Sequence, residues 1–90
     1  MRIDRFLYFI RLVKSRALAQ VVIEAGHVRV DGKRIEKPSE EVRLGSVIAL
    51  PLHDKVRVLR VLGMPPRRGP AREARTCYEE LTIDEGGARS

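Results

Sequence analysis

The sequence predicts an α+β fold: two short N-terminal helices packed on a small, mainly antiparallel sheet of four to five strands, followed by a Pro/Arg-rich arm and a short C-terminal helix. Apolar residues recur at three- and four-residue spacing in the first quarter of the chain, and the spacing then changes to two. The 90 residues are 43% hydrophobic and 33% charged, which is typical of a small globular domain. We expect the main domain over residues 1–62, and the arm, short helix and flexible acidic tail over residues 63–90.

The first helix is expected over residues 3–13, because apolar side chains there share one face. Asp4 lies in its first turn, where a carboxylate favours the helix dipole. Ser15 is a good N-cap for a second helix over residues 16–25, and Gly26 suits the C-terminal end of that helix. The expected apolar face of the second helix consists of Leu18, Ala19, Val22 and Ala25.

A β-hairpin is expected over residues 27–35, because apolar residues alternate there on both sides of Asp31 and Gly32. An Asp-Gly pair suits the tight turn that joins two antiparallel strands. A third strand is expected at residues 47–50, and a fourth at residues 55–62, where charged and apolar residues alternate.

The composition changes after residue 62, where prolines and arginines follow one another. Residues 63–70 cannot continue a strand and are expected to form an extended arm. Residues 71–81 are expected to form a short helix, and residues 82–90 a loose end. The side chains on one side of that helix would be Ala74, Cys77, Tyr78 and Leu81.

Positive charge is concentrated in the first third of the chain. The whole chain has a net charge of +6, and residues 1–34 carry eight basic and three acidic side chains. Residues 63–76 contain four arginines and one glutamate, whereas residues 77–90 are net acidic. This asymmetry favours a polyanionic partner for one surface of the fold, although a charge excess alone fits a solvated surface equally well.

The sequence contains no candidate for a membrane-spanning segment. No apolar run approaches the roughly 20 residues that cross a bilayer, and charges interrupt the N-terminus where a signal peptide would be apolar. The single cysteine, Cys77, excludes an internal disulfide. We therefore expect a cytoplasmic protein with no membrane partner, and we expect a monomer because the domain is small.

Residues that could carry catalysis or bind a metal are few and scattered. His27 and His53 lie far apart, no cysteine or histidine pair has zinc-ligand spacing, and no glycine-rich phosphate loop is present. The two pairs of adjacent glutamates point apart and make poor acid–base pairs. We therefore expect neither an enzyme nor a metal or cofactor. Tyr8 and Phe9 are expected in the core rather than as stacking platforms.

The basic residues, in contrast, form a pattern. Arg16 and Gln20 lie four apart on the polar face of the second helix, and Lys14 and Ser15 form the corner before it. Cations at a helix start oppose the helix dipole, and a phosphate bound at the exposed N–H groups would offset that cost. We expect one phosphate-binding patch made by this corner and the hairpin. Its other members would be Arg2, Arg5, His27, Arg29, Lys33 and Arg34.

Residues 1–50 resemble the RNA-binding domain first recognised in bacterial ribosomal small-subunit protein four, which contains the alpha-L motif. The matching segments are Arg2-Ile3-Asp4-Arg5-Phe6-Leu7, Val13-Lys14-Ser15-Arg16, residues 24–32 and Lys37-Pro38-Ser39. Toward the C-terminus, residues 57–62, Arg67-Arg68-Gly69-Pro70 and the segments up to residue 81 resemble the ribosome-associated heat shock protein 15 family.

These resemblances imply a non-enzymatic protein whose residues 1–62 bind structured ribosomal RNA. They also imply binding to the free large ribosomal subunit that still carries a nascent chain on tRNA, and a role in recycling stalled subunits under heat stress. The RNA-facing residues that they imply are Arg2, Arg5, Lys14, Ser15, Arg16, Gln20, His27, Arg29, Lys33 and Arg34.

Two alternative functions stay open from the sequence. One is a DNA-binding regulator, since two helices with a tight corner resemble a helix-turn-helix. The other is an accessory RNA-binding subunit of an RNA-modifying enzyme, since the same module occurs attached to pseudouridine synthases.

Overall fold

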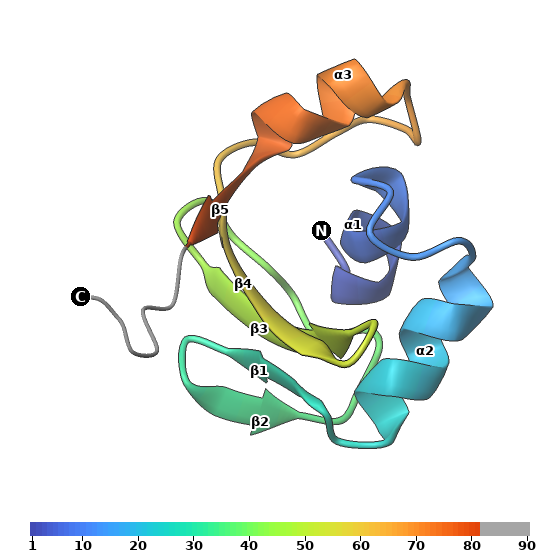
Figure 1. The fold of residues 1–90 in the computed structure, drawn as a ribbon, viewed down its shortest axis with the longest axis vertical. Coiled ribbons are helices and arrows are strands. Elements are labelled where there is room, and N and C mark those ends of the chain that lie inside the picture. Colours follow the sequence, from blue (N-terminus) through green and yellow to red (C-terminus); the bar gives the residue numbers. More distant parts are fainter. Residues whose placement is uncertain (82–90) are drawn as a thin grey trace.

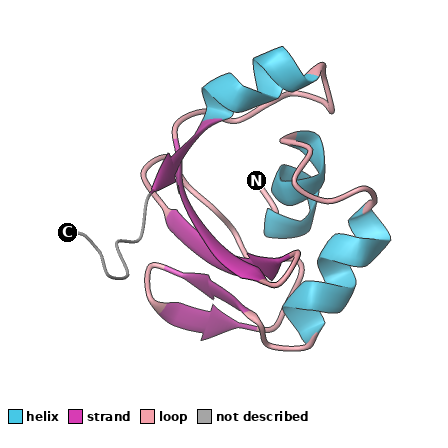
Figure 2. Cartoon of the chain, in the orientation of Figure 1, coloured by secondary structure: helices cyan, strands magenta, loops and turns pink. Residues whose placement is uncertain are grey.

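The structure, a computed structural model, describes residues 1–81 of the chain (Figure 1). Its elements in chain order are α1 (Ile3–Phe9), α2 (Arg16–Glu24), β1 (Val28–Val30), β2 (Lys33–Ile35), β3 (Val47–Leu52), β4 (Lys55–Val61), α3 (Ala71–Ala74), the 3₁₀ turn η1 (Arg75–Cys77) and β5 (Tyr78–Leu81). The strands form one antiparallel sheet in the order β2-β1-β3-β4-β5 (Figure 2). The predicted α+β class, with two N-terminal helices on a five-stranded sheet, is confirmed.

One hydrophobic core joins α1 and α2 to the sheet, which curves around α1 (Figure 1). Because successive strand residues point to opposite faces, each strand gives only alternate side chains to this core. The largest fully buried apolar side chains are Phe6, Ile3, Leu7, Ile10, Ile23, Ile48, Leu50, Leu59, Val28, Val42 and Val61. No helix within residues 1–81 has the length and apolar character needed to cross a membrane.

The first helix ends four residues earlier than expected, at Phe9 rather than at residue 13. Arg11 takes a left-handed conformation with φ of 67°, and the backbone N–H groups of Arg11 and Leu12 donate to the carbonyl oxygens of Tyr8 and Leu7, both at 3.1 Å. This pair of bonds is a Schellman C-cap, in which the left-handed position is usually a glycine. The apolar spacing continued past the cap, so the spacing alone placed the helix end wrongly.

The second helix begins at the expected residue and ends at Glu24, one residue earlier than expected, and both of its predicted caps are confirmed. Ser15 Oγ accepts a hydrogen bond from the Leu18 backbone N–H at 3.1 Å, and the left-handed residue after the helix is Gly26, with φ of 81°. The expected apolar face is only partly correct, because Ala19 is buried but Leu18 is 42% exposed. Ile23, four residues after Ala19, is the other buried side chain of this short helix.

Two tight turns organise the strands. Asp31 and Gly32 both have positive φ, of 52° and 85°, which confirms the predicted hairpin turn between β1 and β2. The Asp31 carboxylate also accepts a hydrogen bond from the Val47 N–H at 2.9 Å, which ties this turn to β3. β3 runs two residues beyond the expected end, so the next turn consists of His53 and Asp54.

The predicted helix over residues 71–81 is wrong in its second half. Helical structure ends with η1, and β5 then pairs with β4 along its whole length. The edge of β4 offers unpaired backbone groups, and β5 satisfies them. Glutamates of β5 also pair with arginines of β4, through Arg57–Glu80 at 2.6 Å and Arg60–Glu79 at 3.4 Å. The expected loose end at residues 82–90 lies outside the described residues, and the division at residue 62 stays a prediction.

Candidate nucleic-acid interface

A buried carboxylate organises the corner between α1 and α2. Asp4 of α1 is fully buried and accepts hydrogen bonds from side chains of α2 and from the N-cap residue of α1. The donors are Arg2 Nε and Nη2 at 3.1 Å each, Arg16 Nη2 at 3.3 Å, Gln20 Nε2 at 3.1 Å and the Arg5 backbone N–H at 2.7 Å. We call Asp4, Arg2, Arg16 and Gln20 the corner cluster.

The corner cluster keeps a positive charge. Burial alone would raise the pKa of Asp4, but the hydrogen bonds from Gln20, Arg2, Arg16 and the Arg5 backbone N–H outweigh burial and hold that pKa below its ordinary value. One ionised carboxylate therefore faces two guanidinium groups. The Arg2 and Arg16 side chains stay 42% and 39% exposed, so both cations reach solvent from a fixed position.

The arrangement of the corner cluster is not explained by stability alone. Arg16 Nε is buried and has no hydrogen-bond partner within residues 1–81. A buried donor without a partner costs free energy, so Asp4 does not satisfy the whole guanidinium group. Such an imperfect local arrangement is typical of a position that serves binding.

The start of α2 lies beside the corner cluster and is open to solvent. Lys14 and Ser15 are exposed, and no acidic side chain lies in the first turn of α2. The partial positive charge of the helix start is therefore uncompensated by the chain itself. Arg5 of α1 is also exposed, and the structure shows no ion pair for it within residues 1–81. This surface is suited to an anion.

The hairpin residues lie on a different part of the fold. Val28 and Ile35 point into the core, so Arg29 and Arg34, which are directly opposite each other, lie on the sheet face away from the helices. Arg29 Nη1 donates to the Gly32 carbonyl at 3.4 Å, and Arg34 pairs with Glu36 at 3.1 Å.

The remaining hairpin members, His27 and Lys33, are exposed. No hydrogen bond or ion pair joins the hairpin group to the corner cluster within residues 1–81. The structure thus brings Arg2, Arg16 and Gln20 into contact with one carboxylate and leaves the hairpin cations separate from them.

Sequence reasoning missed the central residue of this site. The sequence places Asp4 in the first turn of a helix and Arg16 and Gln20 on a polar face, but it does not show that these three side chains bond to one another. The available signal in the sequence was an aspartate among apolar residues. Ile3, Phe6 and Leu7 are apolar, and all three are buried in α1 together with Asp4. An acidic residue inside an apolar stripe needs partners, and the nearest helix supplies them.

The described residues offer no metal site: no group of three or more His, Cys, Asp or Glu side chains within residues 1–81 could hold an ion. The two histidines are both exposed, and Cys77 is half-buried.

Comparison with known proteins places all ten predicted site residues in a matched segment. Residues 1–48 match the family model of the S4 domain. The chain is 39% identical to heat shock protein 15 of Escherichia coli (strain K12) over 79 residues, which are 88% of this chain and 59% of that protein. It is 38% identical to small ribosomal subunit protein uS4 of Limosilactobacillus reuteri over 61 residues, which are 68% of this chain and 29% of that protein.

A solved structure is also similar. The trimeric structure of Vibrio cholerae heat shock protein 15 matches with a TM-score of 0.85 and 32% identity, and the match covers 90% of this chain and 81% of that one. The chain spans less than two thirds of the length of the curated relatives that it matches, at 59% of the Escherichia coli protein.

Proposed function

Because the chain belongs to the heat shock protein 15 family and carries an S4 domain, we propose that it is a non-enzymatic protein that binds structured ribosomal RNA. The observation that carries this proposal is the corner cluster, in which one buried carboxylate fixes two solvent-reaching guanidinium groups beside an open helix start. Its cationic character suits a phosphate backbone, and its rigidity suits a ligand of defined shape.

Binding would work by charge neutralisation and fit. Arg2 and Arg16 donate to phosphate oxygens while Asp4 keeps both side chains in place, so little side-chain entropy is lost on binding. Lys14 and Arg5 add exposed positive charge, and the first N–H groups of α2 accommodate a phosphate. Each neutralised phosphate releases counterions, so the affinity falls steeply as salt rises. No covalent bond changes.

The cellular partner that we propose is the free large ribosomal subunit carrying a nascent chain on tRNA, with a role in recycling stalled subunits under heat stress in the cytoplasm. The support is the similarity to heat shock protein 15, together with a similarity to a ribosomal protein. Sedimentation of a cell lysate through sucrose gradients at two salt concentrations tests this partner. We expect the protein with the free large subunit at low salt, and its presence only at the top of both gradients would contradict the proposal.

Substitution of Arg16 tests the site. We expect Arg16→Gln to weaken RNA binding in a filter-binding titration by about tenfold. We also expect the slope of log affinity against log salt concentration to become shallower by about one. Arg60→Gln is the matched control, because Arg60 forms an exposed ion pair with Glu79 on β4 and should leave the affinity within about twofold. Equal affinity for Arg16→Gln and the unchanged chain would contradict the assignment.

The geometry argues against the DNA-binding alternative. Of the three polar side chains that α2 offers for reading base edges, Arg16, Gln20 and Glu24, the first two are held by Asp4. Competition between duplex DNA and ribosomal RNA fragments separates the two functions, and we expect the RNA fragments to compete better. Co-purification of an RNA-modifying enzyme would instead favour the accessory-subunit alternative.

The monomeric state stays a prediction, although the Vibrio cholerae relative is described as trimeric. Sedimentation equilibrium of the full chain distinguishes the two states directly.

A further inference from the structure

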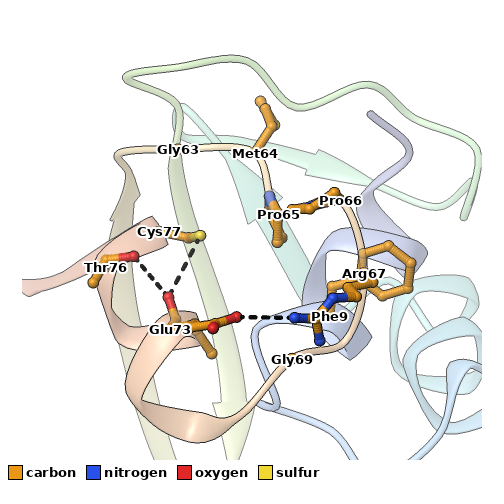
Figure 3. A pocket seen from close by; sticks show the side chains of 11 residues that line it. Phe9, Gly63, Met64, Pro65, Pro66, Arg67, Gly69, Glu73, Thr76 and Cys77 are labelled. Carbon is orange, nitrogen blue, oxygen red and sulfur yellow. Dashed lines mark hydrogen bonds and ion pairs between the residues drawn. The ribbon is translucent and has the colours of Figure 1, made fainter.

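A second candidate site is formed where the end of α1 meets residues 63–77, outside the corner cluster. A cavity of about 230 Å³ opens between the end of α1, the arm and the α3–η1 segment (Figure 3). It is smaller than the roughly 300–1,000 Å³ sites that take drug-sized ligands, so its size suits a single planar ring system. Its apolar lining consists of Phe9, Met64, Pro65, Pro66, Ala74 and Cys77.

Phe9 gives this cavity an aromatic wall. Phe9 was expected in the core, but it is half-buried, lies outside the main hydrophobic cluster and lines the cavity. Its ring centroid lies 6.1 Å from that of Tyr8, and the Arg68 guanidinium covers the Tyr8 ring at 4.6 Å. Arg68 also donates to the Tyr8 carbonyl at 3.0 Å. Arg68 therefore holds Tyr8, the neighbour of Phe9, in place before any ligand arrives.

A cation lies beside that wall. Arg67 reaches from the arm to Glu73 of α3, with 3.5 Å between Nη2 and Oε1 (Figure 3). Both side chains are mostly exposed, at 65% and 63%, and such pairs contribute little to stability. Arg67 can therefore exchange the Glu73 carboxylate for another anion at small cost. The surrounding segment, residues 63–76, contains four arginines and one glutamate, which favours an anionic ligand.

We propose that this cavity binds an unpaired nucleobase of RNA, stacked on Phe9, while Arg67 exchanges Glu73 for the phosphate next to that base. One aromatic face beside one exposed cation is the combination that proteins use for single-stranded nucleic acid. The inference rests on the proposed function, because it extends RNA contact from the corner cluster to the arm. RNA with both a folded stem and a free strand would contact both sites.

Three synthetic RNAs test the base requirement with the full chain: a hairpin with a single-stranded overhang, the same hairpin with an abasic overhang, and the blunt hairpin. By fluorescence anisotropy, we expect the base-containing overhang to bind about 5- to 100-fold more tightly than the abasic one. Phe9→Leu keeps an apolar side chain but removes the aromatic face. We therefore expect this variant to bind the base-containing and abasic overhangs with nearly equal affinity. Arg16→Gln should weaken all three RNAs and preserve the ratio.

Glu73→Gln tests the role of Arg67 with an effect of opposite sign. Removing the competing carboxylate should tighten binding of both overhang RNAs by a few-fold more than Glu79→Gln does, because Glu79 forms a similar exposed pair with Arg60 but lies away from the cavity. Equal effects of the two variants would overturn the exchange at Arg67.

The outcomes separate this inference from the proposed function. Equal affinity of the unchanged chain for the base-containing and abasic overhangs, with the blunt hairpin still bound, would overturn the base site alone. Failure to bind any of the three RNAs would overturn both proposals. Thermal unfolding checks that Phe9→Leu folds. If this variant does not fold, the affinity of the unchanged chain for the base-containing overhang, compared with the abasic one, still tests the base site.

Discussion

Asp4 carries an ionised carboxylate in a fully buried position, which is costly unless the charge is paired and hydrogen-bonded. Its oxygens meet that requirement by accepting from two guanidinium groups, an amide and a backbone N–H. The same bonds fix Arg2 and Arg16 where solvent still reaches them. One residue thus contributes to folding and to the orientation of the proposed RNA-binding cations.

Asp4→Asn tests this double role. The substitution keeps the size of the side chain but leaves two guanidinium groups around a neutral amide, whose NH₂ group cannot accept their hydrogen bonds. We expect the free energy of unfolding in urea to fall by about 2–3 kcal/mol, less than for a fully buried pair because both arginines are partly exposed. We also expect weaker RNA binding despite the extra positive charge.

Asp54→Asn is the control for this prediction, because Asp54 is exposed in the β3–β4 turn and asparagine tolerates its positive φ of 65°. Its free energy of unfolding should change by less than about 0.5 kcal/mol. Tighter RNA binding by a fully stable Asp4→Asn variant would show that Asp4 does not orient the arginines.

At the level of elements, prediction from sequence succeeded where one local signal decides the structure. Ser15 and Gly26 mark both ends of α2, and Asp31 marks the hairpin turn, because each is the residue type that its backbone position requires. It failed where distant contacts decide. No glycine marks the end of α1: the left-handed position of its C-cap is Arg11, whose guanidinium is held by the distant Gly69 carbonyl at 2.8 Å.

Distant contacts also explain the other misses. Residues 78–81 become a strand because the edge of β4 is available to them, and the helical spacing of their apolar side chains does not contain that information. In the candidate site, residue type identified the cations, but only the packing of α1 against α2 reveals which of them share Asp4.

Gly26→Ala tests the C-cap of α2. A Cβ would meet its nearest atoms, on Arg34 and Glu36, at 3.5 Å, so the cost comes from the left-handed backbone rather than from a clash. We expect the free energy of unfolding to fall by about 1–2 kcal/mol in urea denaturation.

Gly63→Ala is the matched control. Gly63 lacks a positive φ, and the added Cβ would have ordinary contact with Cys77 at 3.8 Å. It should be neutral or stabilising by up to about 1 kcal/mol, and equal destabilisation by both variants would contradict the argument.

At the level of the whole molecule, carboxylates stabilise a fold that is positively charged overall. The net charge is +6, and the N-cap of α1, α2, β4 and the arm each have at least one cation paired with a carboxylate: Arg2, Arg16, Arg57 and Arg67. The pairing holds elements together: Asp4 joins α1 to α2, Glu80 joins β5 to β4, and Glu41 joins the loop before β3 to the N-terminal amine. Loss of negative charge at these positions would break the ion pairs that join these elements, and it would increase the repulsion between the remaining cations.

This distribution predicts acid sensitivity of a definite sign. Hydrogen bonding to Arg57 lowers the pKa of Glu80. Burial raises the pKa of Asp4, but the hydrogen bonds that Asp4 accepts from Gln20, Arg2, Arg16 and the Arg5 backbone outweigh burial and lower this pKa. A carboxylate whose pKa is lower in the folded chain contributes stability that is present above its unfolded value, about 4, and is lost as pH falls through its folded value. We expect the free energy of unfolding to stay nearly constant from neutral pH to about pH 5 and to fall steadily below about pH 4.

In urea titrations at a series of pH values, the free energy of unfolding of Asp4→Asn should fall less steeply with decreasing pH. The difference in this free energy between the variant and the unchanged chain should therefore narrow toward low pH. A difference that stays constant through the acid range would show that the ionisation of Asp4 does not stabilise the fold.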